Sequence, residues 1–506
     1  MTAFFLEHFQ LNISKILNSQ TKYKKAMKKH AKKPFLSFLA VITILTALSI
    51  SAYLVFFNTG EPVKVQQTNA RINQTFNTGG STGSGPVKFT STLDNSYYYD
   101  RNSVYLYIDL EADKISESYS RRTPMNISIV IDRSGSMSER NKLDYVKKAV
   151  DYLIDEAGPD DYVSIVTYDD YVDVLQRSQI IREKYELREK INSLQPGGFT
   201  NLSGGMFEGY DQVNNNYMRG YVNKVFLLSD GLANRGITDR YKLADMVREK
   251  NRRDGITIST FGVGNEFNEN LMTDIADYGR GNYYYIKNSS DIPEIFASEL
   301  KGMKNLVGQG TKMKVRFPKD NLRVSKVFGY PYEVEGDYVT IDFKDIFAGQ
   351  KKSVLIKFDV TQPSSKKLVF ENELTYSDVT ADFRQVTERN ENRIEQTSSL
   401  DKYNSSKNEM VVQNIAMFEA NEMMEEAMRN VDEGNYVRAK EIMTGAQDYM
   451  SKQMNDVAPS PEMKRQQENL DRYSKDLESV DKKSEEERNE MQKSGKYDNY
   501  NTRKKN

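Results

Sequence analysis

The chain of 506 residues is long enough for two or three domains, and its 71 Lys and Arg nearly balance its 72 Asp and Glu. This balance gives no electrostatic case for nucleic acid or for an acidic substrate, so we expect no nucleic-acid partner. The absence of Cys excludes disulfides, thiolate metal sites and a cysteine nucleophile. Both histidines, His8 and His30, precede residue 34, which excludes a Ser-His-Asp triad and a His-liganded zinc from the rest of the chain.

The N-terminal region predicts a membrane anchor. Residues 1–33 are rich in Lys and contain one acid, Glu7, and residues 35–57 then run without a charge. A helix of that length, at ~1.5 Å per residue, can cross a hydrocarbon core of ~30 Å. The alternative is a cleaved signal peptide, but the apolar stretch is long and no small-x-small cleavage site follows it cleanly. The lysines predict a single-pass protein with a cytoplasmic N-terminus and the rest of the chain in the periplasm or at the cell surface.

The next segments predict a linker followed by β-structure. Residues 58–86 are polar and rich in Gly, Ser and Thr, which is typical of a flexible linker. Residues 87–121 and 309–385 both alternate apolar and polar side chains, as in VKFTSTL and KSVLIKFDV. The first group has too few strands to be stable alone. We therefore expect the two groups to pair in one β-sandwich, with the intervening domain inserted between them.

Residues 124–305 alternate buried-type strands with amphipathic helices. Asn126–Ile131 and Val225–Ser229 are short apolar runs typical of strands covered on both faces. Helical periodicity follows each of them, for example over 143–157 and 239–253. This order predicts a Rossmann-like α/β domain, with a mostly parallel sheet and helices on both faces.

Hard oxygen ligands follow the two apolar strands. The first strand ends on Asp132, with Ser134 and Ser136 just after it, and the second ends before Asp230. Thr200 lies in a glycine-loosened loop between them. Ligands of open α/β sheets bind beyond the carboxyl ends of the strands, and such oxygens suit Mg²⁺, Mn²⁺ or Ca²⁺. The alternative is structural: Asp132 caps the next helix and the serines make turn bonds.

This set of five residues resembles the metal-ion-dependent adhesion site of von Willebrand factor type A domains. The resemblance implies that the hydroxyls of Ser134, Ser136 and Thr200 ligate the metal, and that Asp132 and Asp230 bind it directly or through water. It also implies that an acidic residue of a protein partner completes the coordination. The layout, with β-structure on both sides, is similar to bacterial membrane-anchored relatives of inter-α-trypsin-inhibitor and calcium-activated-chloride-channel proteins.

The C-terminal part predicts helices and a tail. Residues 405–481 show helical periodicity, with a turn at 432–435 between two helices and a further amphipathic helix after residue 460. The methionines of this region are expected in its core. Residues 482–506 are charged, with acids and bases nearly balanced, and are expected to be a disordered tail.

Three functions are compatible with these sequence patterns. The first is a membrane-anchored protein that binds a protein partner through a divalent cation. The second is a scaffold in a membrane complex that works with an ATPase partner, as type A domains do in magnesium chelatase. The third is an enzyme, and here Asp132 at a strand end resembles haloacid dehalogenase-type phosphatases. Ser134 stands where those enzymes need a second acid, so we expect a binding protein and not an enzyme.

Overall fold

The structure is a computed structural model, and it describes residues 78–80, 85–100, 102–114, 122–264, 267–303 and 305–504. The predicted basic segment 1–33 and the predicted transmembrane helix 35–57 lie outside the described residues. Within the described ranges, no helix has both the length and the apolar composition needed to cross a bilayer.

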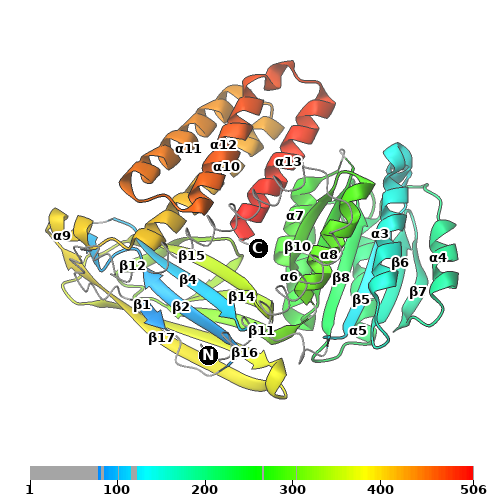
Figure 1. Cartoon of the computed structure of the whole chain (residues 1–506), viewed down its shortest axis with the longest axis horizontal. Helices are drawn as coiled ribbons and strands as arrows, with labels where there is room; N and C mark the ends of the chain where they lie inside the picture. The colour runs from blue at the N-terminus through cyan, green and yellow to red at the C-terminus, as the bar shows by residue number, and fades with distance from the viewer. Residues whose placement is uncertain are drawn as a thin grey trace, which may run out of the picture. The chain divides into compact units, whose positions relative to one another are not determined.

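The α/β domain contains one six-stranded sheet with the strand order β10-β9-β8-β5-β6-β7 (Figure 1). All neighbouring strands are parallel except β6 and β7, which are antiparallel. The strands are β5 (Met125–Asp132), β6 (Tyr162–Tyr168), β7 (Val172–Ile180), β8 (Val222–Ser229), β9 (Thr257–Val263) and β10 (Arg280–Ile286). The helices are η2 (Gly135–Asn141), α3 (Lys142–Glu156), α4 (Lys184–Asn192), α5 (Leu202–Asn215), α6 (Arg240–Asp254), α7 (Glu269–Tyr278) and α8 (Ile292–Met303). The expected mostly parallel sheet is confirmed.

The central strands are buried on both faces because their alternate side chains enter two different cores. In β5, Ile129 and Ile131 pack with α3 and α8, whereas Val130 packs on the opposite face with α5, α6 and α7. In β8, Phe226 and Leu227 divide between the same two cores. Every residue of β5 and β8 is buried, which explains why the two segments are nearly continuous apolar runs.

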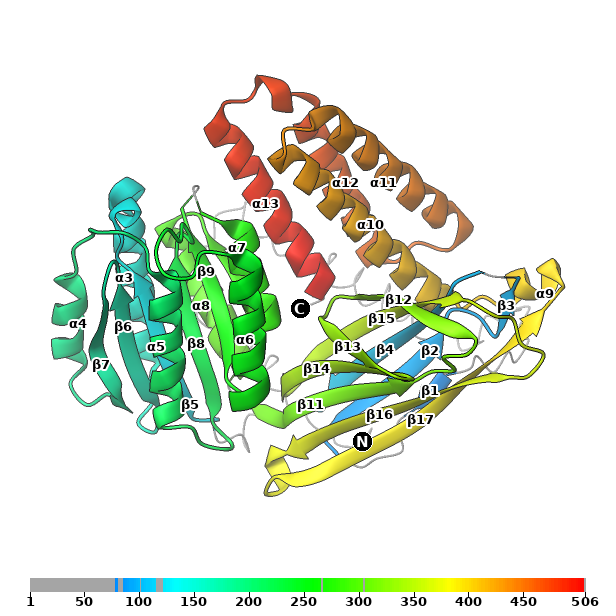
Figure 2. The same cartoon turned by 180° about the vertical axis from the view of Figure 1, so that it is seen from behind.

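The β-sandwich consists of two sheets around one core, and the α/β domain is inserted between β4 and β11 (Figure 2). The strand orders are β1-β2-β4-β15-β12 and β13-β14-β11-β16-β17-β3. The strands are β1 (Thr78–Gly80), β2 (Val87–Leu93), β3 (Tyr97–Tyr99), β4 (Val104–Ala112), β11 (Leu306–Arg316), β12 (Leu322–Phe328), β13 (Tyr332–Glu335), β14 (Tyr338–Phe347), β15 (Lys351–Val360), β16 (Leu368–Asp378) and β17 (Arg384–Thr397). Strand β4 pairs with β15 across this insertion.

The predicted flexible linker 58–86 requires one correction. Its residues 78–80 form strand β1, in which Thr78 pairs with Thr92 of β2. This pairing uses backbone hydrogen bonds at the edge of a sheet, which any residue can make. A Thr-Gly-Gly sequence therefore forms a strand there, although it lacks the hydrophobic alternation from which a strand is predicted.

The C-terminal region is a helical bundle with a methionine-rich core, which contains Met417, Met424, Met428 and Met443. Its helices are α9 (Leu400–Ser405), α10 (Glu409–Asp432), α11 (Tyr436–Asp456), α12 (Pro461–Glu478) and α13 (Glu485–Lys504). Figure 2 shows α10, α11 and α12 side by side.

The prediction of a disordered tail over 482–506 is wrong for residues 485–504, which form α13. Met491 enters the helical core, and Tyr500 is buried in the α/β domain with its ring 5.6 Å from that of Tyr283. The charges of α13 have particular buried partners: the Lys493 ammonium donates to the carbonyl of Phe267 over 3.0 Å. A prediction from composition alone takes such charges to be solvated, because composition gives no information about the partners that the folded protein provides.

Candidate metal centre

The two acids of the predicted site lie at the same edge of the sheet. Asp132 is the last residue of β5, and Asp230 directly follows β8. Strands β5 and β8 are parallel neighbours, with Ile131 paired to Leu228. Both acids are fully buried, and burial, followed by the charge of Asp230, raises the pKa of Asp132. The parallel pairing therefore brings two buried carboxyl groups close together.

Backbone hydrogen bonds tie three loops together at this edge. The amide of Gly197 donates to the carbonyl of Arg133 over 2.8 Å, and the amide of Gly135 donates to the carbonyl of Gly198 over 3.1 Å. On the other side, the Thr200 amide donates to Oδ1 of Asn234 over 2.8 Å. The loop that carries Thr200 is thus bound to both acid-bearing loops, and Thr200 itself is only 2% exposed.

The serine hydroxyls lie beside Asp132. The oxygen Oγ of Ser134 is 3.2 Å from Oγ of Ser136, and the Ser134 amide donates to Oδ1 of Asp132 over 2.9 Å. Ser134 is buried, whereas Ser136 is half-buried. The loop therefore leads from a buried carboxylate to hydroxyls nearer the surface.

Two side chains that the sequence did not single out hold the other oxygen of Asp132. Oδ2 accepts hydrogen bonds from the hydroxyl of Ser229 over 2.6 Å and from that of Tyr168 over 3.1 Å. Burial, followed by the charge of Asp230, raises the pKa of Asp132 to about 6. These donors fix the carboxyl group and stabilise its charged form.

Asp230 has a buried cationic partner, Lys142. Its Oδ2 is 3.1 Å from the Lys142 ammonium, and the side chains are 0% and 1% exposed respectively. Its Oδ1 accepts from the Leu232 amide over 3.4 Å, and its carbonyl accepts from the Asn268 amide over 3.0 Å. Sequence reasoning missed Lys142, although one signal was available: a cation is disfavoured at the first residue of a helix, where the helix dipole is positive. An acid beyond that helix end offsets the penalty.

Exposed apolar side chains lie on the same loops. Phe199 is 59% exposed and Leu232 is 42% exposed. The guanidinium of Arg235 lies 5.7 Å from the ring centre of Phe199 and forms an ion pair with Asp170. The surface beside the site therefore offers apolar contact area and charged groups that are already paired.

The donor set fits a hard divalent cation. Two buried acids and three hydroxyls provide only oxygen atoms, which such cations prefer. Within the described residues, no group of three or more His, Cys, Asp or Glu is placed to hold a metal. The proposed five-residue site does not require such a group, because three of its five ligands are hydroxyls.

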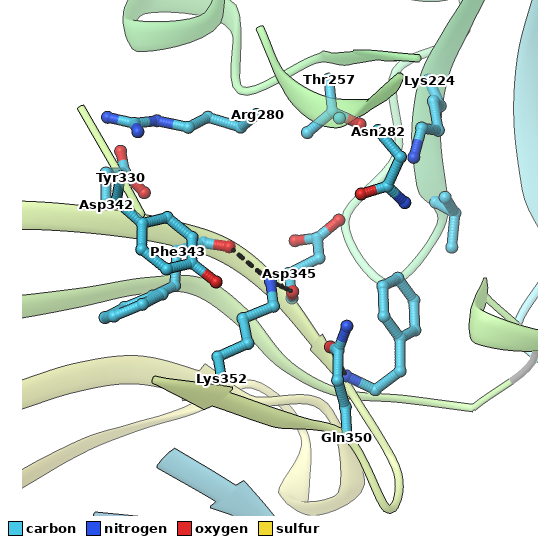
Figure 3. A pocket seen from close by; sticks show the side chains of 13 residues that line it. Lys224, Thr257, Arg280, Asn282, Tyr330, Asp342, Phe343, Asp345, Gln350 and Lys352 are labelled. Atoms are coloured by element: carbon cyan, nitrogen blue, oxygen red, sulfur yellow. Dashed lines mark hydrogen bonds between the residues drawn. The ribbon is translucent and has the colours of Figure 1, made fainter. Parts of the chain in front are cut away.

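A pocket elsewhere in the molecule contains none of these five residues (Figure 3). It is lined by residues of the α/β domain, such as Lys224 and Arg280, and of the β-sandwich, such as Asp345 and Lys352. The ammonium of Lys352 donates to the backbone carbonyls of Phe343 and Asp345 over 3.1 and 3.0 Å. Burial raises the pKa of Asp345 to about 6. The acidic and basic side chains that line this pocket face one another. We therefore assign the pocket to the packing between the α/β domain and the β-sandwich.

The fold and the position of the site define an α/β domain with a candidate ligand site at the carboxyl edge of its sheet. Residues 126–298 match the von Willebrand factor type A domain, so the chain contains a domain of this family. YfbK of Escherichia coli is 33% identical over 266 residues, which are 50% of this chain and 46% of that protein. Human inter-alpha-trypsin inhibitor heavy chain H3 is 27% identical over 177 residues, which are 33% of this chain and 20% of that protein.

Both relatives are therefore matched over less than half of their own length. Among solved structures, a von Willebrand factor type A protein from Catenulispora acidiphila has a TM-score of 0.60 at 16% identity. That similarity covers 74% of this chain and 89% of the other. At this identity it shows a shared fold and no more.

Proposed function

We propose that the carboxyl edge of the sheet binds one divalent cation, Mg²⁺, Mn²⁺ or Ca²⁺, and through it a carboxylate of a protein partner. The ligands would be Asp132, Ser134, Ser136, Thr200 and Asp230. The observation that carries the proposal is the pair of buried carboxyl groups beside serine hydroxyls, where burial, followed by the negative charge of Asp230, raises the pKa of Asp132 to about 6. A cation of charge two would offset this repulsion with ligands of the type it prefers.

The chain's own residues prepare the site in three ways. Ser229 and Tyr168 hold Asp132, Lys142 holds Asp230, and loop-to-loop hydrogen bonds hold Thr200. A bound divalent cation supplies a concentrated positive charge that an outside carboxylate can meet directly. Because the ligands are already held, little conformational entropy has to be lost on binding.

A protein partner fits the surroundings of the site better than a small substrate does. Phe199 and Leu232 provide exposed apolar area beside the loops, and such area is typical of the contact surfaces of proteins. No His or Cys follows residue 30, which removes histidine, the most frequent general base, and a cysteine nucleophile. We therefore propose binding and not catalysis.

We also propose that residues 35–57 anchor the chain, with the α/β domain outside the membrane. The uncharged segment and the lysines before it support this proposal. Because the chain has no Cys, a single Ser138→Cys substitution on the exposed loop gives one labelling site. A membrane-impermeant maleimide should label it in spheroplasts, whereas Asn12→Cys should be labelled only after lysis. The reverse pattern would show the opposite orientation.

The direct test is thermal unfolding of the detergent-purified chain with each cation or with a chelator. A cation that binds only the folded state should add ~2.7 kcal/mol at 100 times its dissociation constant. The increase should disappear in Asp132→Ala.

Asp161→Ala is the matched control for this substitution. Asp161 is also a buried acid of the same domain, but it pairs with Arg122 over 2.6 Å, away from the five residues. Its loss should lower stability while the response to cation persists. Absence of a response in the wild-type chain to any of the three cations would refute the proposed site.

A further inference from the structure

A buried lysine beside the candidate metal ligands needs an explanation. Lys142 is only 1% exposed, and its ammonium lies 3.1 Å from Oδ2 of Asp230. Burial of an ammonium carries a large desolvation cost unless a partner offsets it. Lys142 is also the first residue of α3, where the helix dipole disfavours a cation. Asp230 is the acid that offsets both costs.

The lysine stem is held against the backbone of another loop. Gly264 follows β9 with φ of +78°, a conformation that favours glycine. A Cβ atom added there would lie 3.0 Å from Cε and 3.2 Å from Cγ of Lys142. The backbone at Gly264 thus packs directly on the stem, and the ammonium is directed toward the carboxylate. This packing makes Lys142 a fixed charge of the site.

The charge of Lys142 changes what the site offers to a cation. Asp132 and Asp230 together carry two negative charges when ionised, and the hydroxyls carry none. With Lys142 the charged side chains carry a net charge of minus one, so a bound divalent cation leaves a net charge of plus one. Without Lys142 the same cation would be neutralised. The lysine therefore weakens cation binding and keeps the occupied site attractive to a carboxylate.

We propose that Lys142 is a positioning residue that binds Oδ2 of Asp230 and sets the cation affinity of the site by supplying a permanent counter-charge. This inference rests on the proposed cation site. Oδ1 of Asp230, which among the described residues accepts a long 3.4 Å hydrogen bond from the Leu232 amide, is then the oxygen available to a cation. The occupancy of such a site is reversible, because part of the acidic charge is already compensated.

The alternative is that Lys142 only stabilises the fold. The two hypotheses predict opposite changes in cation affinity when the charge of Lys142 is removed. Loss of a counter-charge tightens cation binding, because the attraction of the acids is no longer opposed. Loss of a purely structural ion pair disturbs Asp230 and weakens cation binding.

The test is isothermal titration of Mn²⁺ into the detergent-purified whole chain and two variants. Lys142→Met removes the charge and the donor, and Lys142→Gln removes the charge but keeps an amide that can donate to Asp230. Near-ultraviolet circular dichroism in chelator establishes that each variant is folded. We expect both to bind Mn²⁺ roughly 10- to 100-fold more tightly than the wild-type chain, because nearby unit charges interact strongly at an effective dielectric constant of ~20.

Lys224→Met is the matched control. Lys224 is a buried lysine of the same sheet, paired with Glu299 over 2.6 Å, and it lies near the opposite end of β8 from Asp230. Its loss should lower the melting temperature and leave the Mn²⁺ affinity unchanged. An equal increase of affinity in this control would overturn a specific role for Lys142.

The remaining outcomes separate this inference from the proposed function. If the wild-type chain binds Mn²⁺ and the folded Lys142 variants bind it equally or more weakly, the inference is overturned and the cation site stands. If only the Lys142 variants bind Mn²⁺, the counter-charge is supported and the proposed function fails for the wild-type chain. If no variant binds Mn²⁺, both are overturned.

Discussion

Two charge clusters in the described part of the chain differ in composition. The sheet-edge cluster comprises Asp132, Asp230 and Lys142, with serine and threonine hydroxyls around it. The second, here called the α13 cluster, comprises Glu269 of α7, Asp432 at the end of α10, and Lys493 and Lys496 of α13. The Lys496 ammonium lies 3.3 Å from Glu269 and 2.7 Å from Asp432. The sheet-edge cluster has one more acid than base, whereas the α13 cluster has two of each.

This difference separates the candidate binding site from a structural contact. In the α13 cluster, the lysines already occupy the positions that a cation would take, so the charges hold three helices together. In the sheet-edge cluster, an acidic charge is left over beside hydroxyl oxygens. Burial of acids alone therefore does not predict a metal site. A metal site is predicted where acids outnumber bases and uncharged oxygen ligands lie beside them.

The largest effect on the α13 cluster is expected from Lys496→Met. It would leave the buried Glu269 and the 32% exposed Asp432 without the cation that they share. The expected cost lies between the ~0–1 kcal/mol of an exposed ion pair and the ~3–5 kcal/mol of a fully buried one. We expect α13 to detach, with loss of hydrogen-exchange protection in residues 485–504. Arg472→Ala is the control, because Arg472 pairs with Asp498 on the same helix but is 60% exposed. Unchanged protection in Lys496→Met would mean that apolar contacts alone hold α13.

The second prediction concerns pH and Glu269. Burial raises the pKa of Glu269 to about 7 from its ordinary value of 4.5, although Lys496 and Lys493 act against the shift. A raised folded-state pKa means that the folded protein binds the proton more tightly than the unfolded chain. This contribution to stability is present below pH ~4.5 and is lost as the pH rises to ~7.

Glu269→Gln tests this sign, because glutamine resembles the protonated acid at every pH. The free energy of unfolding of the wild-type chain should fall relative to that of Glu269→Gln between pH 5 and 8, by up to ~3 kcal/mol for a shift of this size. Denaturant titrations across that range measure it. Parallel pH profiles of the two proteins would show that Glu269 is ionised throughout, as in an ordinary ion pair.

The sheet-edge cluster was predicted from the sequence only in part. The short, nearly continuous apolar runs of β5 and β8 predicted the central strands, and the oxygens at their ends predicted which residues the sheet would bring together. Metal binding by those residues stays a prediction. Lys142 was missed because its role depends on Asp230, with which it pairs, and on Gly264, which packs against its stem, and both residues are distant from it in the sequence.

The α13 helix was missed for a related physical reason. Its residues 485–504 have helix-forming side chains, but balanced charges over a short segment are also typical of a solvated tail. The order of this helix depends on Tyr283, Glu269 and Asp432, which lie on separate elements far away in the chain. Local periodicity contains no information about such partners. The order of residues 485–504 could therefore be recognised only from the tertiary structure.

The smallest effect is expected where α13 meets the loop of the sheet-edge cluster directly. Arg140 of η2 pairs with Glu486 over 2.8 Å, and the two side chains are 46% and 58% exposed. Exposed ion pairs of this kind contribute ~0–1 kcal/mol, because water already solvates both charges. Arg140→Ala should therefore leave the exchange protection of α13 and the Mn²⁺ affinity of the chain unchanged. A marked loss of either would mean that this pair couples the two clusters, and that the stability of α13 is not set by its buried charges alone.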